Sequence, residues 1–182
     1  HTEMDVIAGA ARSYYAAVLG AEALKVAEEA VKSAQADLER VKEEATLVKT
    51  ACLESVRWLS VSYQGRLANT AIRGVCPEYG DMHNEVAKEG RWISAQDLVE
   101  RRRVVFLGGR IREQLFSGRP AVGEEAEING MRFTVIGIME RKLQMSNYFT
   151  SDDRSVFIPF TTAGDLWSTK YASVMVFEPV AP

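Results

Sequence analysis

The fold depends most on the stretch Phe133-Thr134-Val135-Ile136-Gly137-Ile138-Met139 and on the residues around it. The chain enters this stretch through Ile128-Asn129-Gly130-Met131-Arg132. Asn-Gly is typical of a tight hairpin turn, because glycine adopts positive φ without steric cost and asparagine tolerates it. Downstream, residues 152–160 provide a second predicted strand that ends in a proline. This part of the chain therefore predicts a β-rich scaffold and not a catalytic pocket.

Turn signals and apolar spacing divide the chain from residue 43 onward into short elements. Residues 43–55 have helical spacing, whereas the alternating pattern around Gln64-Gly65 predicts a hairpin of residues 56–63 and 67–75. Ser94, with Asp97 three residues later, predicts a capped helix over 94–102. Further strands and helices are predicted over 104–107, 109–116, 124–128, 131–139, 156–160, 161–167 and 172–177. The prediction is an α+β domain with short helices packed on a mixed, mostly antiparallel sheet.

The first third of the chain has a different pattern, which predicts a long amphipathic helix. No proline occurs between about Glu3 and Lys42, and alanine is abundant there. Apolar residues recur every seven positions, and a second set follows three positions on. This predicted helix seam consists of Leu24, Ala27, Val31, Ala34, Leu38 and Val41. We therefore predict two parts, a coiled-coil-like helix over 1–45 that favours a partner helix and an α+β domain over 46–182.

Charge and hydropathy exclude some classes of function. The 182 residues carry a net charge of −3, whereas a nucleic-acid surface normally needs a basic face. No stretch approaches the roughly 18 to 20 apolar residues that a membrane-spanning helix needs. The N-terminus is acidic, and no cleavable signal sequence is predicted there.

Three short motifs contain residue types that serve in catalysis or ligand binding, but none has the required spacing. Gly108-Gly109 precedes a predicted helix without a phosphate-loop or dinucleotide pattern. Ser151-Asp152-Asp153 has neither a nearby histidine nor the Gly-x-Ser-x-Gly pattern of hydrolases. Asp81, His83 and Glu85 are metal-ligand types in a loop-like stretch, where a polar turn is the preferred interpretation. The sequence thus predicts no catalytic residue, no cofactor and no metal ligand.

The two cysteines leave two interpretations open. Cys52 and Cys76 would form a disulfide in an oxidising compartment. Two unrelated buried thiols would give the same sequence pattern, so the pairing is not decided at this level.

Seven segments carry a resemblance to a known family through their order and spacing. They are RGVCPEY (73–79), EGRWI (89–93), VVFLG (104–108), QLFSG (114–118), PAVGE (120–124), INGMRFTVIG (128–137) and VFIPFTTA (156–163). Over about residues 56–178 the chain resembles the periplasmic core domain of MacB-like, macrolide-exporter-type ABC transporter permeases. Residues 11–34 are similar, with lower specificity, to a helix of TolC-like outer-membrane efflux proteins.

The resemblance implies a non-catalytic domain at the periplasmic face of the bacterial inner membrane. Such a domain transmits conformational change and docks a periplasmic adaptor (membrane-fusion) protein, which bridges to an outer-membrane efflux channel. The family's membrane anchors and ATPase would lie outside these 182 residues. Aromatic and charged residues of one loop are the candidate partner-binding residues, because loops between strands often carry interaction residues. They are Tyr148, Phe149, Asp152, Asp153 and Arg154.

Two other functions remain open from the sequence. A small-ligand-binding domain would use a pocket lined by Trp58, Trp92 and Trp167, although three tryptophans in a chain of this size are more often core residues. A coiled-coil assembly module, or an engineered fragment, would use the N-terminal helix for self-association and carry the remaining domain as cargo.

Overall fold

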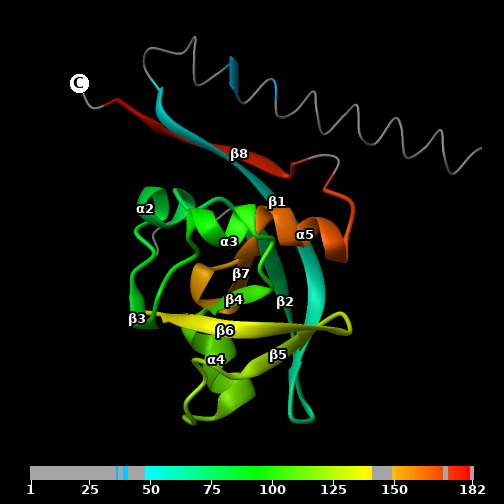
Figure 1. Cartoon of the computed structure of the whole chain (residues 1–182). Helices are drawn as coiled ribbons and strands as arrows, with labels where there is room; N and C mark the ends of the chain where they lie inside the picture. Colours follow the sequence, from blue (N-terminus) through cyan, green and yellow to red (C-terminus); the bar gives the residue numbers. More distant parts are fainter. Residues whose placement is uncertain (1–35, 37–38, 41–47, 141–148, 170–171, 181–182) are drawn as a thin grey trace, which may run out of the picture.

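Strands dominate the structure, a computed structural model that describes residues 36, 39–40, 48–140, 149–169 and 172–180 (Figure 1). The described residues from 48 onward form eight strands, four α-helices of five to eight residues and one 3-10 helix, and residues 36, 39 and 40 are helical. In chain order these elements are β1 (Val48–Tyr63), β2 (Arg66–Val75), α2 (Tyr79–His83), β3 (Ala87–Gly90), α3 (Ala95–Val99), β4 (Val104–Leu107), α4 (Gly109–Phe116), β5 (Glu125–Ile128), β6 (Met131–Met139), η1 (Asp152–Arg154), β7 (Ser155–Pro159), α5 (Phe160–Leu166) and β8 (Val174–Pro179).

Six of the strands close into a barrel-like ring. The strand order is β2-β7-β4-β6-β5-β1, and β1 also pairs with β2. Val61 of β1 lies between Ala68 of β2 and Ile128 of β5, so both edges of β1 are paired at that point. The β2–β7 and β4–β6 pairs are parallel, and the other pairs are antiparallel. Closure leaves these strands without a free edge over the paired residues.

Two strands extend the sheet beyond the ring. The first half of β1 pairs with β8 as a two-stranded ribbon that leaves the barrel (Figure 1). β3 pairs with the end of β6. The long strand β1 therefore belongs to the barrel at one end and to the ribbon at the other.

The predicted α+β fold class is wrong. The described residues form mainly β-structure, in which a curved, nearly closed sheet is accompanied by helices of no more than eight residues. The error arose because a sequence shows single hairpins, whereas ring closure depends on long-range pairings such as β1 with β5. The predicted helix over 1–45, with its seam, lies outside the described residues except for residues 36, 39 and 40.

Residues 48–55 also differ from the prediction, because they form the start of β1 and not a helix. Residues 48–54 pair with β8, and Ser55 is already opposite Gly74 of β2. Pairing with β8, continued by pairing with β2 from Ser55 onward, thus overrides the amphipathic helical spacing of this segment. The remainder of the predicted helical segment, residues 43–47, lies outside the described residues.

Two tight turns confirm the predicted hairpins. Asn129 and Gly130 have φ of 47° and 81°, and they join β5 to β6. Gln64 and Gly65 have φ of 46° and 79°, and they join β1 to β2. Positive φ at both central residues is the geometry whose twist matches that of the flanking strands.

The main core fills the barrel. Its strand residues are fully or almost fully buried, and α4 closes one end of the barrel (Figure 1). Helix α4 contributes Ile111, Leu115 and Phe116, which its helical spacing places on one face. A second cluster lies under α2 and α3 and consists of Cys52, Val75, Tyr79, Ile93, Phe106, Met139 and Phe157.

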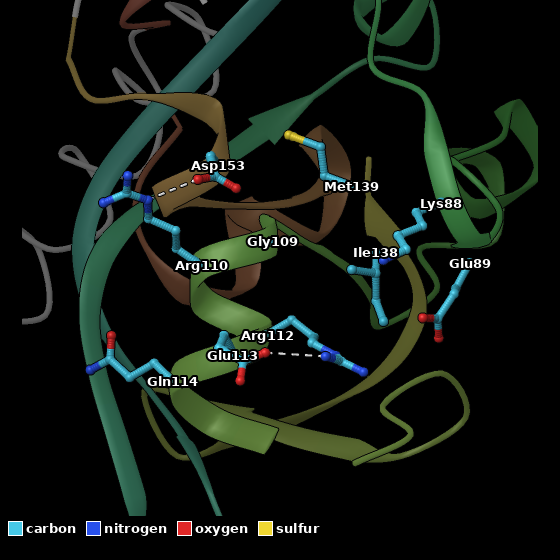
Figure 2. Close-up of a pocket in the computed structure, with 10 residues that line it drawn as sticks. All are labelled: Lys88, Glu89, Gly109, Arg110, Arg112, Glu113, Gln114, Ile138, Met139 and Asp153. Carbon is cyan, nitrogen blue, oxygen red and sulfur yellow. Dashed lines mark hydrogen bonds and ion pairs between the residues drawn. The ribbon is translucent and has the colours of Figure 1, made fainter. Parts of the chain in front are cut away.

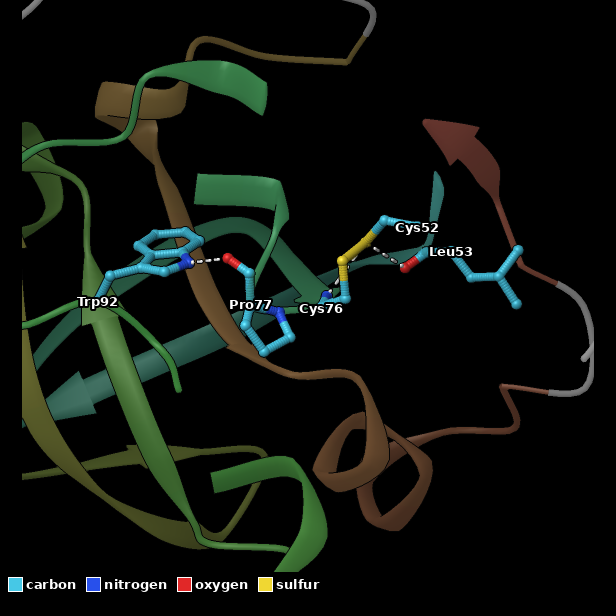
Figure 3. Close-up of a disulfide and its surroundings, with 5 residues drawn as sticks. All are labelled: Cys52, Leu53, Cys76, Pro77 and Trp92. Carbon is cyan, nitrogen blue, oxygen red and sulfur yellow. Dashed lines mark hydrogen bonds between the residues drawn. A yellow bond between two sulfur atoms is a disulfide. The ribbon is translucent and has the colours of Figure 1, made fainter. Parts of the chain in front are cut away.

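Cys52 and Cys76 form a disulfide, which settles the alternative that the sequence left open (Figure 3). The bond joins the ribbon half of β1 to the residue that follows β2. Directly after it, Pro77 accepts a hydrogen bond of 2.9 Å from Nε1 of Trp92. The disulfide and this hydrogen bond connect the ribbon, the barrel and the second core cluster.

Helix α3 begins at the predicted cap. The Ser94 hydroxyl accepts a hydrogen bond from the backbone N–H of Asp97, and the Asp97 carboxylate accepts one from the backbone N–H of Ser94. Arg91 donates two further hydrogen bonds, of 2.6 and 2.9 Å, to the same carboxylate. Burial would raise the pKa of Asp97, but the hydrogen bonds from Arg91 and Ser94 outweigh it and hold the pKa well below its usual range.

We expect Asp97→Asn to lower the free energy of unfolding by about 1 to 3 kcal/mol at pH 7, because a buried charged acceptor with several donors is lost. A depressed carboxyl pKa gives stability that is present above the unfolded-state pKa of about 3.9 and is lost as the pH falls further. The difference between wild type and variant in urea titrations should therefore be constant from pH 7 to about pH 4 and shrink below that. A difference that is the same at pH 2.5 and pH 7 would contradict this assignment.

Candidate functional site

The predicted partner-binding loop divides into exposed and buried residues. Phe149 is 44% exposed, and Arg154 is also exposed. The Asp153 carboxylate accepts a hydrogen bond of 3.0 Å from Nε of Arg110 on α4. Asp152, by contrast, is only 1% exposed, so its carboxylate is not available to a partner protein. Tyr148 lies outside the described residues.

Asp152 belongs to a buried ion-pair network. Nη1 of Arg73 lies 2.6 Å from Oδ1 of Asp152, and Nε of Arg73 lies 2.5 Å from Oε1 of Glu54. All three side chains are at most 2% exposed. The guanidinium also lies 5.4 Å from the ring centres of Tyr79 and Phe157. This network joins β1, β2 and η1 inside the domain, a structural role that the sequence did not reveal.

An exposed tryptophan marks the surface next to this loop. Trp58 of β1 lies opposite Ala71 of β2 and is 62% exposed. It lines a groove of about 410 Å³ together with Asn69, Thr70, Arg110, Ile111, Gln114, Thr150 and Arg154. We call this set, with the adjoining Phe149, the Trp58 surface. It combines residues from β1, β2, α4 and the loop before β7, which are distant in sequence.

The Trp58 surface contains residue types that are common in protein-binding sites. Tryptophan and arginine are the residue types most enriched among those that dominate binding energy. Arg110 is paired with Asp153, whereas the Arg154 side chain makes no ion pair with another residue in the described part of the chain. The Thr70 hydroxyl donates to the backbone carbonyl of Arg154 and thereby fixes the loop against β2.

A larger groove lies on the neighbouring side of α4 (Figure 2). It has a volume of about 730 Å³ and is lined by residues of β3, α4, the end of β6 and η1. Three of its charged side chains are positive and three are negative, and four of them pair with one another: Arg110 contacts Asp153, and Arg112 contacts Glu113 at 3.2 Å (Figure 2). Charges compensated in this way provide no strong field for an ionic ligand.

The three tryptophans do not line one pocket. Trp92 packs against Phe106 and Phe157 of the second core cluster, with ring centres 4.7 and 5.4 Å apart. Trp167 packs against the main core, and its Nε1 donates to the hydroxyl of Ser55 at 2.9 Å. Trp58 is exposed on the barrel surface. The predicted tryptophan-lined ligand pocket is therefore absent from the described residues.

Sequence reasoning found only part of the Trp58 surface. Phe149 and Arg154 were found because aromatic and charged residues in a loop between strands are a usable signal. Asn69, Arg110 and Gln114 were not found, because they carry no motif and meet only through the pairing of β1 with β2 and the packing of α4 on β2. Trp58 is an exposed aromatic residue within strand β1, and exposure cannot be read from one sequence.

Comparison with known proteins places this geometry in a family. A family model described as the MacB-like periplasmic core domain matches residues 7–180. The chain belongs to this family. The match includes residues on both sides of the boundary at residue 45 that the sequence predicted. The similarity of residues 11–34 to TolC-like proteins remains a prediction.

Relatives and solved structures agree with membership of the MacB-like family. The chain is 33% identical over 103 residues to a macrolide export ATP-binding/permease protein MacB of Chlorobium luteolum, covering 57% of this chain and 15% of that protein. It is 30% identical over 133 residues to an uncharacterized ABC transporter permease, YvrN, of Bacillus subtilis, covering 72% of this chain and 31% of that permease.

The fold resembles the extracellular domain of the ABC-type transporter YknZ from Gram-positive bacteria, with a TM-score of 0.69, 18% identity and coverage of 80% of this chain and 72% of that one. It also resembles the periplasmic region of MacB from Actinobacillus actinomycetemcomitans, with a TM-score of 0.61 and 15% identity. The match covers 71% of this chain and 56% of that one.

The family match identifies the chain as a MacB-like periplasmic core domain, and the solved structures agree with it in fold. The chain spans only 15% and 18% of the length of two of its MacB relatives. Within the described residues, every helix is too short or too polar to cross a membrane.

Proposed function

We propose that this MacB-like domain is a non-catalytic docking and coupling element of an ABC-type export permease. In this proposal the Trp58 surface binds a periplasmic adaptor (membrane-fusion) protein, which in turn connects to an outer-membrane efflux channel. The observation that carries the proposal is the 62% exposure of Trp58 beside Arg154 and the exposed Phe149. Large aromatics left exposed on a closed barrel are costly in water, and contact with a partner would bury them.

The Trp58 surface is held by a paired strand and a buried ion pair, and this rigidity favours a specific docking site over a mobile, nonspecific patch. Trp58 lies on a strand that is paired with β2 along residues 55–63. Arg154 follows the buried Asp152, whose ion pair with Arg73 holds η1 to the barrel. A rigid surface loses little conformational freedom on binding, which favours affinity.

The coupling role is supported by the path of β1. Its 16 residues run without interruption from the ribbon with β8 to the hairpin turn at Gln64. The disulfide at Cys52 joins the ribbon half of β1 to the end of β2. Movement of the ribbon would therefore be transmitted to the barrel through a paired strand and a covalent bond, and not through a flexible linker.

The docking proposal is tested by capture from a periplasmic extract of the source organism. We expect the full 182-residue chain to retain an adaptor protein, identified by mass spectrometry and then purified for titration. The Trp58→Ala, Arg154→Ala double variant should bind that adaptor at least about 30-fold more weakly, since a central tryptophan typically contributes 2 kcal/mol or more. The measurement is the dissociation constant of each variant for the purified adaptor.

Phe177→Ala is the matched control, because Phe177 of β8 is also aromatic and is 60% exposed. The control should bind as the wild type does, and all variants should show wild-type circular dichroism. Unchanged affinity in the double variant would remove the Trp58 surface from the proposal. Capture of no adaptor by any variant would contradict the docking function itself.

A further inference from the structure

The outer edge of β2 is only partly covered by another strand. Pairing of β2 with β7 begins at Ala71, which lies opposite Ser155, and continues to Val75. Within the described residues, no strand pairs with this edge over residues 66–70, although β1 pairs with the other edge there. A strand edge without a partner presents backbone N–H and C=O groups that can pair with another chain.

The backbones of Leu67 and Asn69 face this open edge. In an antiparallel pair, opposite residues either exchange both backbone hydrogen bonds or direct these groups to the two outer sides. The Ser60 carbonyl accepts a hydrogen bond of 3.4 Å from the N–H of Asn129, which follows β5, so Ser60 and the opposite Asn69 form a pair of the second kind. Leu67 lies two residues before Asn69 in β2 and therefore has the same orientation.

A side chain of α4 occupies one of these backbone groups. Nε2 of Gln114 donates a hydrogen bond of 3.1 Å to the Leu67 carbonyl, which agrees with the outward orientation of Leu67. The backbone N–H and C=O of Asn69 have no hydrogen-bond partner among the described residues. Gln114 is exposed, so the backbone N–H of an incoming strand can take its place.

The groove of the Trp58 surface borders the open edge. Asn69 and Thr70 of β2 line one side of it, and Arg110 and Gln114 of α4 line the other. The two α4 side chains are four residues apart and lie on the same side of the helix (Figure 2). Trp58 lines the same groove, so a segment bound along the edge of β2 would contact the surface that we assign to docking.

The charge of this groove favours an acidic ligand. Its lining, as far as the structure describes it, contains Arg110 and Arg154 and no carboxylate. Arg110 pairs with Asp153 at 3.0 Å, whereas Arg154 makes no ion pair with a described residue. The chain as a whole carries a net charge of −3, so this positive charge is a local feature. An acidic side chain of a partner would meet a complementary charge here.

From the open backbone edge and the arginine beside it, we infer that the docking partner binds through an extended, acidic segment that adds a strand to β2 at Leu67 and Asn69. This inference rests on the proposed docking function and specifies its binding mode. Backbone hydrogen bonds to an added strand provide affinity, and the side chains that alternate along it provide specificity. An acidic side chain of the segment pairs with Arg154, and Gln114 releases the Leu67 carbonyl to the segment.

Hydrogen–deuterium exchange of the wild-type chain, resolved to single residues by mass spectrometry, tests the inference without a substitution. The probe is the adaptor protein purified for the docking test. The amides of Leu67 and Asn69 should exchange rapidly in the free domain and at least about tenfold more slowly in the saturated complex. The amide of Ala68, which pairs with Val61 of β1, should be protected in both states.

A proline at position 69 tests the same contact through binding. Asn69→Pro removes the N–H that faces the added strand and spares the pairing with β1, because that N–H does not point toward β1. The matched variant Asn69→Ala keeps this N–H and loses the side-chain hydrogen bond from Ser60. Asn69→Pro should bind the adaptor at least about tenfold more weakly than Asn69→Ala. If Asn69→Pro does not fold by circular dichroism, the exchange measurement on the wild type decides.

The acidic character of the segment is tested at Arg154. Arg154→Glu should bind the adaptor more weakly than Arg154→Ala, because it places a like charge opposite the segment. Unchanged exchange at Leu67 and Asn69, equal affinities of the two Asn69 variants, or an Arg154→Glu variant that binds no more weakly than Arg154→Ala would overturn the inference and leave the docking function standing. A wild type that binds no adaptor would contradict the docking function, and the inference with it.

Discussion

Replacing Arg73 with methionine is expected to lower the free energy of unfolding by about 3 to 5 kcal/mol, because Glu54 and Asp152 would lose the cation that pairs with both of them in the interior. Methionine keeps much of the volume of the aliphatic stem, so most of the loss comes from uncompensated charge and not from a cavity. Urea denaturation at pH 7, followed by circular dichroism, measures the change.

The control for this prediction is Arg132→Met. Arg132 pairs with Glu125 at 3.5 Å, but its side chain is 78% exposed, and such a pair contributes no more than about 1 kcal/mol. The triple change Arg73→Met, Glu54→Gln and Asp152→Asn removes both carboxylate charges with the guanidinium and should recover part of the lost stability. A loss below 1 kcal/mol for Arg73→Met alone, similar to that of Arg132→Met, would show that the buried network does not hold η1 to the barrel.

Loss of the disulfide is expected to have the second largest effect. The Cys52→Ala, Cys76→Ala double variant should be less stable by about 3 kcal/mol, within a range of 2 to 5, because the bond closes a loop between residues 24 apart in sequence and restricts the unfolded chain. Alanine is preferred to serine here, since Cys52 is 1% exposed and a hydroxyl at that position would be buried.

Treatment with a reductant distinguishes the contribution of the covalent bond to stability from that of the packing of the two side chains. Dithiothreitol should lower the melting temperature of the wild type and leave that of the double variant unchanged. A wild type that does not respond to reductant under unfolding conditions would contradict the disulfide. The bond also agrees with the periplasmic placement of the family, because that compartment is oxidising.

The sequence predicted local structure well where one or two residues determine the backbone. The turns at Gln64-Gly65 and Asn129-Gly130 and the cap at Ser94 were predicted, because positive φ and the capping box depend on side chains close in sequence. Helix α4 was predicted because its apolar residues have helical spacing. These features are encoded locally and need no knowledge of the fold.

The parts that were missed depend on contacts between distant segments. Ring closure needs Val61 to pair with Ile128, and the start of β1 becomes a strand through pairing with β8. Asp152 looked like a surface carboxylate because acidic residues in loops are usually exposed, yet the buried Arg73 draws it inward. The residues that the sequence placed on one interaction loop thus serve two purposes: Phe149 and Arg154 face solvent, and Asp152 holds the loop to the core.

Photo-crosslinking from position 58 tests the docking proposal most directly. A photoreactive aromatic residue replaces Trp58 in the full chain, and a parallel sample carries it in place of Phe177. Both proteins are irradiated in periplasmic extract, and the crosslinked products are identified by mass spectrometry. We expect an adaptor (membrane-fusion) protein to be crosslinked from position 58 and not from position 177. Adaptor crosslinks from position 177 alone, or no adaptor crosslink from either position, would contradict docking through the Trp58 surface.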